Sequence, residues 1–333
     1  MTSSEWVAEE SSFRDPSGFV FYRENQLYRQ INRRYEADYN QLIQSGLYEA
    51  LVDSNLLVSH KEVDIAPARE RNFFRIIKPD VIPFISYPYE WCFSELKDAA
   101  LLTLNIQKIA LNYGMSLRDC SAFNIQFTHA RPILIDTLSF GIYNEGEPWA
   151  AYKQFCQHFL APLMLMSRRD IRLNQLCVTE LDGIPLKLAR VLLSHRAYSS
   201  WPAFLHIYLH AHYENFYGER FVQRRAGGKR FGTQSFRGLI DSLESAVTNL
   251  TVKQPKSEWL AYATEGHNYG DDSLNHKMEI VDSYLRRCNP REVWDLGANT
   301  GLFSRVASAQ HCRVIAFDQD PHCVEANYVQ TRK

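Results

Sequence analysis

The chain has 333 residues, 45% of them hydrophobic, which is enough to bury a substantial core and long enough for two domains. Its 37 basic and 38 acidic residues leave a net charge of −1, which gives no sign of a nucleic-acid or acidic-membrane partner. No stretch approaches the roughly 18 uncharged apolar residues of a membrane span, and the acidic N-terminus is unlike a secretory signal. Seven scattered cysteines, none in C-x-x-C spacing, indicate neither a disulfide framework nor a zinc knuckle. We therefore expect a soluble, cytoplasmic protein.

The first elements are expected to be extended. A polar segment, 1–12, is predicted to be disordered. Residues 13–31 follow as a hairpin, in which a Pro-Ser-Gly turn precedes two apolar-aromatic runs. Helical spacing of apolar residues then runs from 35 to 51. A further extended pair is predicted around 73–77 and 81–85.

A long helix comes next in the prediction. Ser94 has the side chain of an N-cap, and Gly114 is the expected stop. Two short runs, 124–127 and 132–135, indicate a second hairpin, and the stretch from 149 to about 250 favours helices. These elements predict an α+β domain over residues 13–250, followed by a polar linker at 251–257 that contains a proline.

The remaining residues, 258–333, change in style and predict an α/β arrangement. A helix is expected from 271 to 287, a strand at 292–295, a helix at 302–309 and a second strand at 313–317. The last residues are expected to begin another helix.

The strongest motif joins the first of these strands to its helix through Asp295-Leu-Gly297-Ala-Asn299-Thr-Gly301. Gly297 allows a ligand to approach the backbone, and Gly301 allows tight entry into the helix, because neither carries a Cβ. Asp295, at the carboxyl end of the strand, can accept a hydrogen bond from a cationic amino-acid group. Asp318 ends the second strand 23 residues later (318 − 295), where a carboxylate can bind both hydroxyls of a ribose. We expect the two carboxylates to bracket one nucleoside-sized crevice.

This pattern resembles the first two motifs of class I S-adenosylmethionine-dependent methyltransferases, D/E-x-G-x-x-x-G followed by an acidic residue on the second strand. Trp259, Tyr262, Tyr269 and Lys277 also occur in an order similar to that of a bacterial methyltransferase family with a long N-terminal region, some members of which are described in connection with nodulation. The resemblance implies a Rossmann-like sheet and S-adenosylmethionine as the cofactor. The cofactor-binding residues that it implies are Asp295, Gly297, Asn299, Gly301 and Asp318, with Tyr269 closing over the methionine end.

The resemblance reaches only two of the seven strands of such a domain, so we expect a partial methyltransferase domain that cannot methylate alone. A small molecule or a saccharide is expected as the methyl acceptor in preference to a nucleic acid. A dinucleotide site is the main alternative, but the sequence has no G-x-G-x-x-G. A strand-turn-helix without a ligand, in a non-enzymatic binding or scaffold protein, is the other.

A second motif lies in the N-terminal domain. The order Arg118-Asp119, Asn124 and Asp136 resembles the catalytic core of kinase-like phosphotransferases, where H-R-D-x-x-x-x-N precedes a hairpin and a metal-binding Asp. The resemblance implies that Asp119 orients an acceptor hydroxyl and that Asn124 and Asp136 hold Mg²⁺. Leu117 replaces the histidine, and Arg29 is nearest to the place of the usual lysine. A degenerate kinase-like domain, or simple turn and cap residues, are the alternatives.

Two clusters carry less weight. His206 and His210, with His212, have a spacing that a metal could use, but no third ligand is indicated, and we expect ordinary histidines and no metal. The basic run from Arg220 to Arg230 is more typical of a solvated loop than of an anion site.

Overall fold

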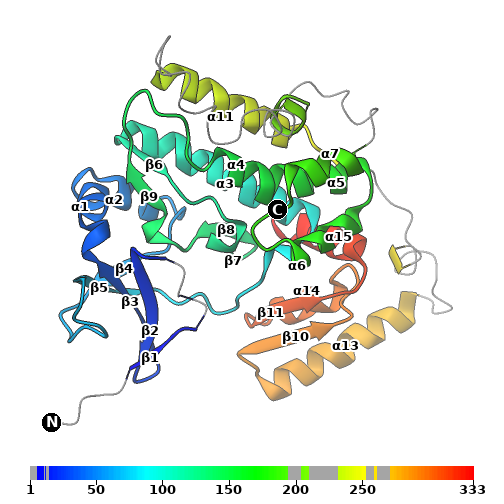
Figure 1. Cartoon of the computed structure of the whole chain (residues 1–333). Helices are drawn as coiled ribbons and strands as arrows, with labels where there is room; N and C mark the ends of the chain where they lie inside the picture. The colour runs from blue at the N-terminus through cyan, green and yellow to red at the C-terminus, as the bar shows by residue number, and fades with distance from the viewer. Residues whose placement is uncertain are drawn as a thin grey trace.

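A computed structural model describes residues 6–10, 12, 15–193, 204–209, 232–252, 259–260 and 271–333 (Figure 1). The fold mixes α-helices and β-strands. Within these ranges, none of the helices combines the length and the apolar character that spanning a membrane requires. Several residues discussed above lie outside the described residues: Tyr262, Tyr269, His210, His212 and the basic run from Arg220 to Arg230.

The N-terminal part begins with a five-stranded antiparallel sheet in the order β1-β2-β3-β5-β4. Its strands are β1 (Trp6–Ala8), β2 (Gly18–Arg23), β3 (Gln26–Asn32), β4 (His60–Glu62) and β5 (Phe73–Pro79). The hairpin predicted over 13–31 is formed by β2 and β3, which turn at Glu24 and Asn25, both with positive φ.

Two expectations for this sheet were wrong. Trp6–Ala8 are not disordered, because β1 pairs with β2 and the Trp6 ring lies 6.1 Å from the Phe19 ring. Strand β5 does not pair with 81–85 but lies between β3 and β4. A tertiary contact orders β4, since the Tyr48 hydroxyl accepts from the backbone N–H of His60 at 2.7 Å. A strand of three residues is too short to give a period-2 signal of its own.

The helical segment predicted over 35–51 is divided into α1 (Glu36–Gln44) and α2 (Leu47–Asp53) at Gly46, whose φ is +82°. The next helix, α3 (Phe93–Asn112), ends just before Gly114 as predicted. Its N-cap is Cys92 and not Ser94, because the Glu95 side chain reaches back to accept the Cys92 N–H at 2.8 Å. Ser94 lies within the first turn.

Short antiparallel pairs follow α3. β6 (Met115–Leu117) pairs with β9 (Phe140–Ile142), while β7 (Ile125–Thr128) and β8 (Arg131–Leu134) form the second predicted hairpin. The segment expected to be helical contains α4 (Tyr152–Phe155), α5 (Ala161–Arg168), α6 (Leu176–Thr179), α7 (Leu186–Leu192) and α11 (Thr233–Thr248). The main apolar core extends from Leu42 to Leu250 and contains the fully buried Phe155, Phe159 and Phe236.

The C-terminal part consists of α13 (Asp271–Cys288), β10 (Glu292–Leu296), α14 (Leu302–Ser308), β11 (Arg313–Phe317) and α15 (Pro321–Thr331). β10 and β11 are parallel, with Asp295 opposite Ala316. Their bounds agree with the predicted elements to within about one residue. Figure 1 shows α13 on the outer side of these strands and α15 next to the helices of the N-terminal part.

Candidate functional site

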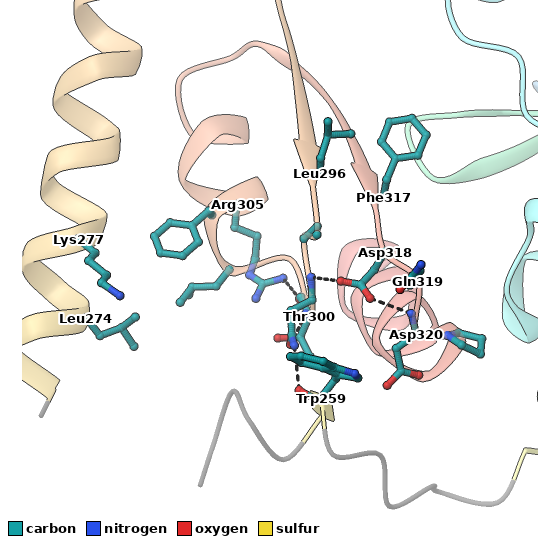
Figure 2. Close-up of a pocket in the computed structure, with 16 residues that line it drawn as sticks. Trp259, Leu274, Lys277, Leu296, Thr300, Arg305, Phe317, Asp318, Gln319 and Asp320 are labelled. Carbon is teal, nitrogen blue, oxygen red and sulfur yellow. Dashed lines mark hydrogen bonds between the residues drawn. The ribbon is translucent and has the colours of Figure 1, made fainter. Parts of the chain in front are cut away.

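A pocket of about 1180 Å³ lies at the carboxyl ends of β10 and β11 (Figure 2). One wall is the turn after β10, from Leu296 to Thr300, and another is the segment after β11, from Phe317 to Pro321. Leu274 and Lys277 project from α13 toward the turn, and Trp259 lies beside Thr300 in Figure 2. Because β10 and β11 are parallel, their carboxyl ends meet at one edge, where open α/β sheets bind ligands.

The turn after β10 is built on left-handed residues. Gly297 has a φ of +80°, and a Cβ added there would meet nothing within 4 Å, so its backbone faces open space. Gly301 has a φ of +79°, but a Cβ there would lie 2.0 Å from the Asn327 side chain. Gly297 therefore gives a ligand access to the backbone, while Gly301 lets α15 approach the start of α14.

Asp318 lines the pocket and is held in position by the backbone. One carboxylate oxygen accepts the Asn299 N–H at 2.7 Å, and the other accepts the Asp320 N–H at 2.8 Å. The first bond joins the two strand ends, as the dashed lines in Figure 2 mark. Each oxygen keeps a second lone pair, so the carboxylate can accept further hydrogen bonds from a ligand.

Asp295 does not lie where we expected it. The sequence predicted that Asp295 and Asp318 bracket one crevice, but Asp295 is not among the residues that line the pocket. Its carboxylate instead accepts the Ser304 hydroxyl of α14 at 2.6 Å. The reason is the alternation of side chains along β10, which directs Asp295 toward α14 and leaves its neighbours Trp294 and Leu296 exposed.

The other predicted cofactor residues divide in the same way. Gly297 and Asn299 line the pocket, Gly301 does not, and Tyr269 lies outside the described residues. The Asn299 amide donates to the Trp259 carbonyl at 2.8 Å, so this residue connects the turn to Trp259.

Sequence reasoning missed Arg305 and Asp320. Asp320 had a signal, since an Asp before Pro321 is typical of an N-cap, and it accepts the His322 N–H at 2.9 Å. Arg305 donates to the Thr300 carbonyl at 2.9 Å, a contact without a signal in the local pattern.

In the N-terminal part, the structure places Asp136 beside Asn124. The Asn124 amide donates to the Ser139 hydroxyl at 3.2 Å, and that hydroxyl donates to Asp136 at 2.8 Å. Asp136 also forms an ion pair with Arg29, which in turn binds Asp15 at 3.0 Å. Both carboxylate oxygens of Asp136 are therefore engaged by the protein itself.

Asp119 is engaged through one oxygen. Its Oδ1 accepts both the Gln154 amide at 2.7 Å and the Ser121 N–H at 2.9 Å. Burial lowers the pKa of the nearby His158 to about 4, against the opposing charge of Asp119, so this histidine is neutral at physiological pH. Among the described residues, no group of three or more His, Cys, Asp or Glu side chains is arranged to hold a metal ion.

No protein-family model matches the chain. Among curated proteins, the nodulation protein NoeA of Rhizobium meliloti (strain 1021) is 34% identical over 334 residues, which cover 97% of this chain and 69% of NoeA. Among solved structures, that of vaccinia related kinase 3 aligns with 76% of this chain and 93% of its own, at 10% identity and a TM-score of 0.33.

Proposed function

The chain belongs to the family of the nodulation protein NoeA, and within that family we propose that its C-terminal part binds S-adenosylmethionine for methyl transfer. The observation that carries this proposal is the pocket at the parallel strand ends, with Asp318 and the open backbone of Gly297 in its walls. The identity to NoeA over nearly the whole chain shows the family, and the pocket supports the proposed chemistry.

The side chains that line the pocket are of the types that bind the parts of S-adenosylmethionine. The Asp318 carboxylate suits the two hydroxyls of a ribose, and the positive φ of Gly297 leaves backbone exposed where a Cβ would intrude. Trp259, Phe303 and Phe317 provide aromatic surface in the pocket lining for the apolar faces of a nucleoside. When bound, the cofactor supplies a methyl group on a sulfonium, and the role of this chain is to hold and orient it.

Asp295 is proposed to act indirectly. Its hydrogen bond to Ser304 connects the end of β10 to α14, across the turn that contains Gly297. Loss of that bond would loosen the turn without removing a group from the pocket surface. This differs from the direct contact with the methionine ammonium that the motif implied.

The pocket suits a dinucleotide less well. Pyrophosphate binding at such a turn requires free backbone N–H groups at the helix start. Here the Asn299 N–H is taken by Asp318, and the Thr300 N–H is taken by the Asn299 side chain at 2.7 Å.

We further propose that the N-terminal part has a kinase-like architecture without phosphotransfer activity. The order of an antiparallel sheet, α3, the loop with Asp119 and the β7–β8 hairpin supports the architecture. The ion pair of Arg29 with Asp136 weighs against retained chemistry, because both oxygens of this carboxylate would have to exchange protein partners for a metal ion.

Calorimetric titration with S-adenosylhomocysteine tests the main proposal, because binding can be measured without knowing the acceptor. We expect saturable binding with one site, and the same titration with NAD⁺ should give none. Asp318→Ala removes a charged hydrogen-bonding group and should weaken binding roughly 10- to 100-fold. Glu292→Ala is the matched control, since this exposed carboxylate lies at the opposite end of β10 and pairs with Arg313. Absence of binding by the parent chain, or equal affinity for NAD⁺, would overturn the proposal.

A small molecule or a saccharide is proposed as the methyl acceptor. The near-neutral charge of the chain argues against nucleic acid, which needs an excess of Lys and Arg to meet its phosphates. Binding to duplex DNA in low salt, measured by fluorescence anisotropy, would contradict this choice.

A further inference from the structure

We propose that the N-terminal part acts as a positioning scaffold for the C-terminal pocket, through a contact in which the start of α3 holds α15. The nature of the pocket ligand rests on the proposed function, but the contact itself does not. Figure 1 shows α15 beside α3, although more than 200 residues separate them along the chain.

The first half of the contact is a carboxylate that caps α3 from outside. The Ser94 backbone N–H donates to Glu325 at 2.8 Å, and the Ser94 hydroxyl donates to the other oxygen of the same carboxylate at 2.6 Å. The first turn of a helix has N–H groups without partners in the helix, and its positive end attracts an anion. Ser94 is buried, so without Glu325 this donor would have little access to water.

The second half lies along the same stripe of α15. The Tyr328 hydroxyl donates to Asp98 at 2.9 Å, and Arg332 forms an ion pair with the same carboxylate. The Tyr328 ring also meets the Phe127 ring of β7 edge to face, with the centroids 6.0 Å apart. Positions 325, 328 and 332 are spaced by three and four residues, so one face of α15 is directed at the N-terminal part.

The contact is connected to the pocket by a short path. Asp318 accepts the Asp320 N–H, Asp320 caps α15 through the His322 N–H, and Glu325 lies one turn further along α15. At the start of this path, the Phe84 ring packs 5.9 Å from the Phe317 ring. The pocket wall from Phe317 to Pro321 is therefore contacted directly at Phe317 by the N-terminal part, and its other end is held through α15 by the Glu325 contact.

The C-terminal part has little apolar core of its own that could hold this pocket wall in place. No member of the main apolar cluster lies beyond Val252 among the described residues, and β10 leaves Trp294 and Leu296 exposed at 57% and 74%. A wall with few buried neighbours depends more on its docking contacts for its position. The contact between α3 and α15 therefore gives the N-terminal part a role that does not use Asp119 or Asp136.

The test is a double-mutant cycle on the full chain with Ser94→Ala and Glu325→Ala, read by hydrogen exchange of residues 317–322. Glu325→Ala removes both bonds and should speed exchange in this wall most, whereas Ser94→Ala removes only the hydroxyl bond and leaves the backbone N–H bond, so its effect should be smaller. The double variant should resemble Glu325→Ala, because Ser94 has no further bond to Glu325 to lose. Glu325→Gln keeps one acceptor oxygen and should give an intermediate rate. Glu292→Ala is the control on the C-terminal part, as it removes an exposed ion pair away from α15.

Affinity for S-adenosylhomocysteine provides the second readout. Each variant should bind roughly 2- to 30-fold more weakly, the range expected for residues that act on a site without touching the ligand. Unchanged exchange of 317–322 in folded Glu325→Ala would overturn the scaffold. Lack of binding by the parent chain would instead overturn the proposed cofactor, and the exchange measurement would still decide the scaffold. Additive effects in the cycle would also refute the shared contact.

Discussion

Glu95 provides a sharp test of the electrostatics at the start of α3. Burial raises the pKa of this carboxyl from 4.5 to about 7, against the opposing Cys92 N–H bond, and the neighbouring Glu325 and Asp98 raise it further. Between these two values the folded chain binds a proton that the unfolded chain has lost. The free energy of unfolding therefore falls as the pH rises through this window, and the contribution is fully present only below 4.5.

The magnitude follows from the same two values. Each pH unit across the window costs about 1.4 kcal/mol, which sums to roughly 3 kcal/mol. Because the side chain is only partly buried, we expect solvent screening to leave about 2 kcal/mol. Glu95→Gln removes the titration and keeps an oxygen that can accept the Cys92 N–H, so the helix cap is retained.

The assay is urea unfolding of the parent and Glu95→Gln at about pH 5 and about pH 8. Relative to the parent, the variant should gain about 2 kcal/mol between the two conditions. Burial lowers the pKa values of His60 and His158 to about 4, which gives the opposite pH dependence, but both proteins share it and it cancels in the difference. Glu90→Gln is the matched control, since Glu90 accepts the Tyr87 N–H at 2.7 Å in the same capping geometry but is exposed. A Glu95→Gln difference that does not change with pH would refute the reasoning.

Three further predictions concern stability. Gly301→Ala should lower the free energy of unfolding by about 1–3 kcal/mol, because the added Cβ would meet Asn327 and the φ of this residue is +79°. Gly238→Ala, in open space on α11, is the control and should raise the free energy of unfolding by up to about 1 kcal/mol, and calorimetric melting compares the two variants. Asp136→Ala should lower the free energy of unfolding by about 2 kcal/mol or more, because it leaves the partly buried Arg29 without this partner. Mg·ATP should not shift the melting temperature of the parent, and a clear shift would restore the phosphotransfer hypothesis. Phe236→Ala should cost about 3–5 kcal/mol in urea unfolding, since the ring is fully buried against Trp149 and Tyr143, and a cost below about 1 kcal/mol would contradict that packing.

The local sequence pattern was sufficient to predict an element wherever the signal for that element lies within the segment itself. The order β10, glycine turn, α14, β11 could be predicted because period-2 and helical spacing alternate there and Gly297 and Gly301 mark the turn. Gly114 predicted the end of α3 for the same reason, since a glycine accepts the positive φ of +70° that the chain needs there.

The sequence could not predict which neighbour a polar side chain would bind. Ser94 has the chemistry of an N-cap, but Glu95 caps α3 from within and leaves Ser94 to bind Glu325 from a distant helix. Asp295 matches the motif, yet its place on β10 directs it to Ser304 and away from the pocket. Arg29 and Asp136 are 107 residues apart, and no local pattern relates them.

The amino-acid sequence by itself therefore determined the elements of the C-terminal part and the place where a pocket can form, because turns and periodicity depend on neighbours along the chain. Tertiary structure alone decided that Asp318 lines the pocket while Asp295 does not, and that α3 holds α15. The contact between α3 and α15 depends on packing between segments far apart in sequence, whereas the difference between Asp318 and Asp295 depends on how α14 and β11 pack against β10. In both cases the free energy of burying a polar group selects its partner.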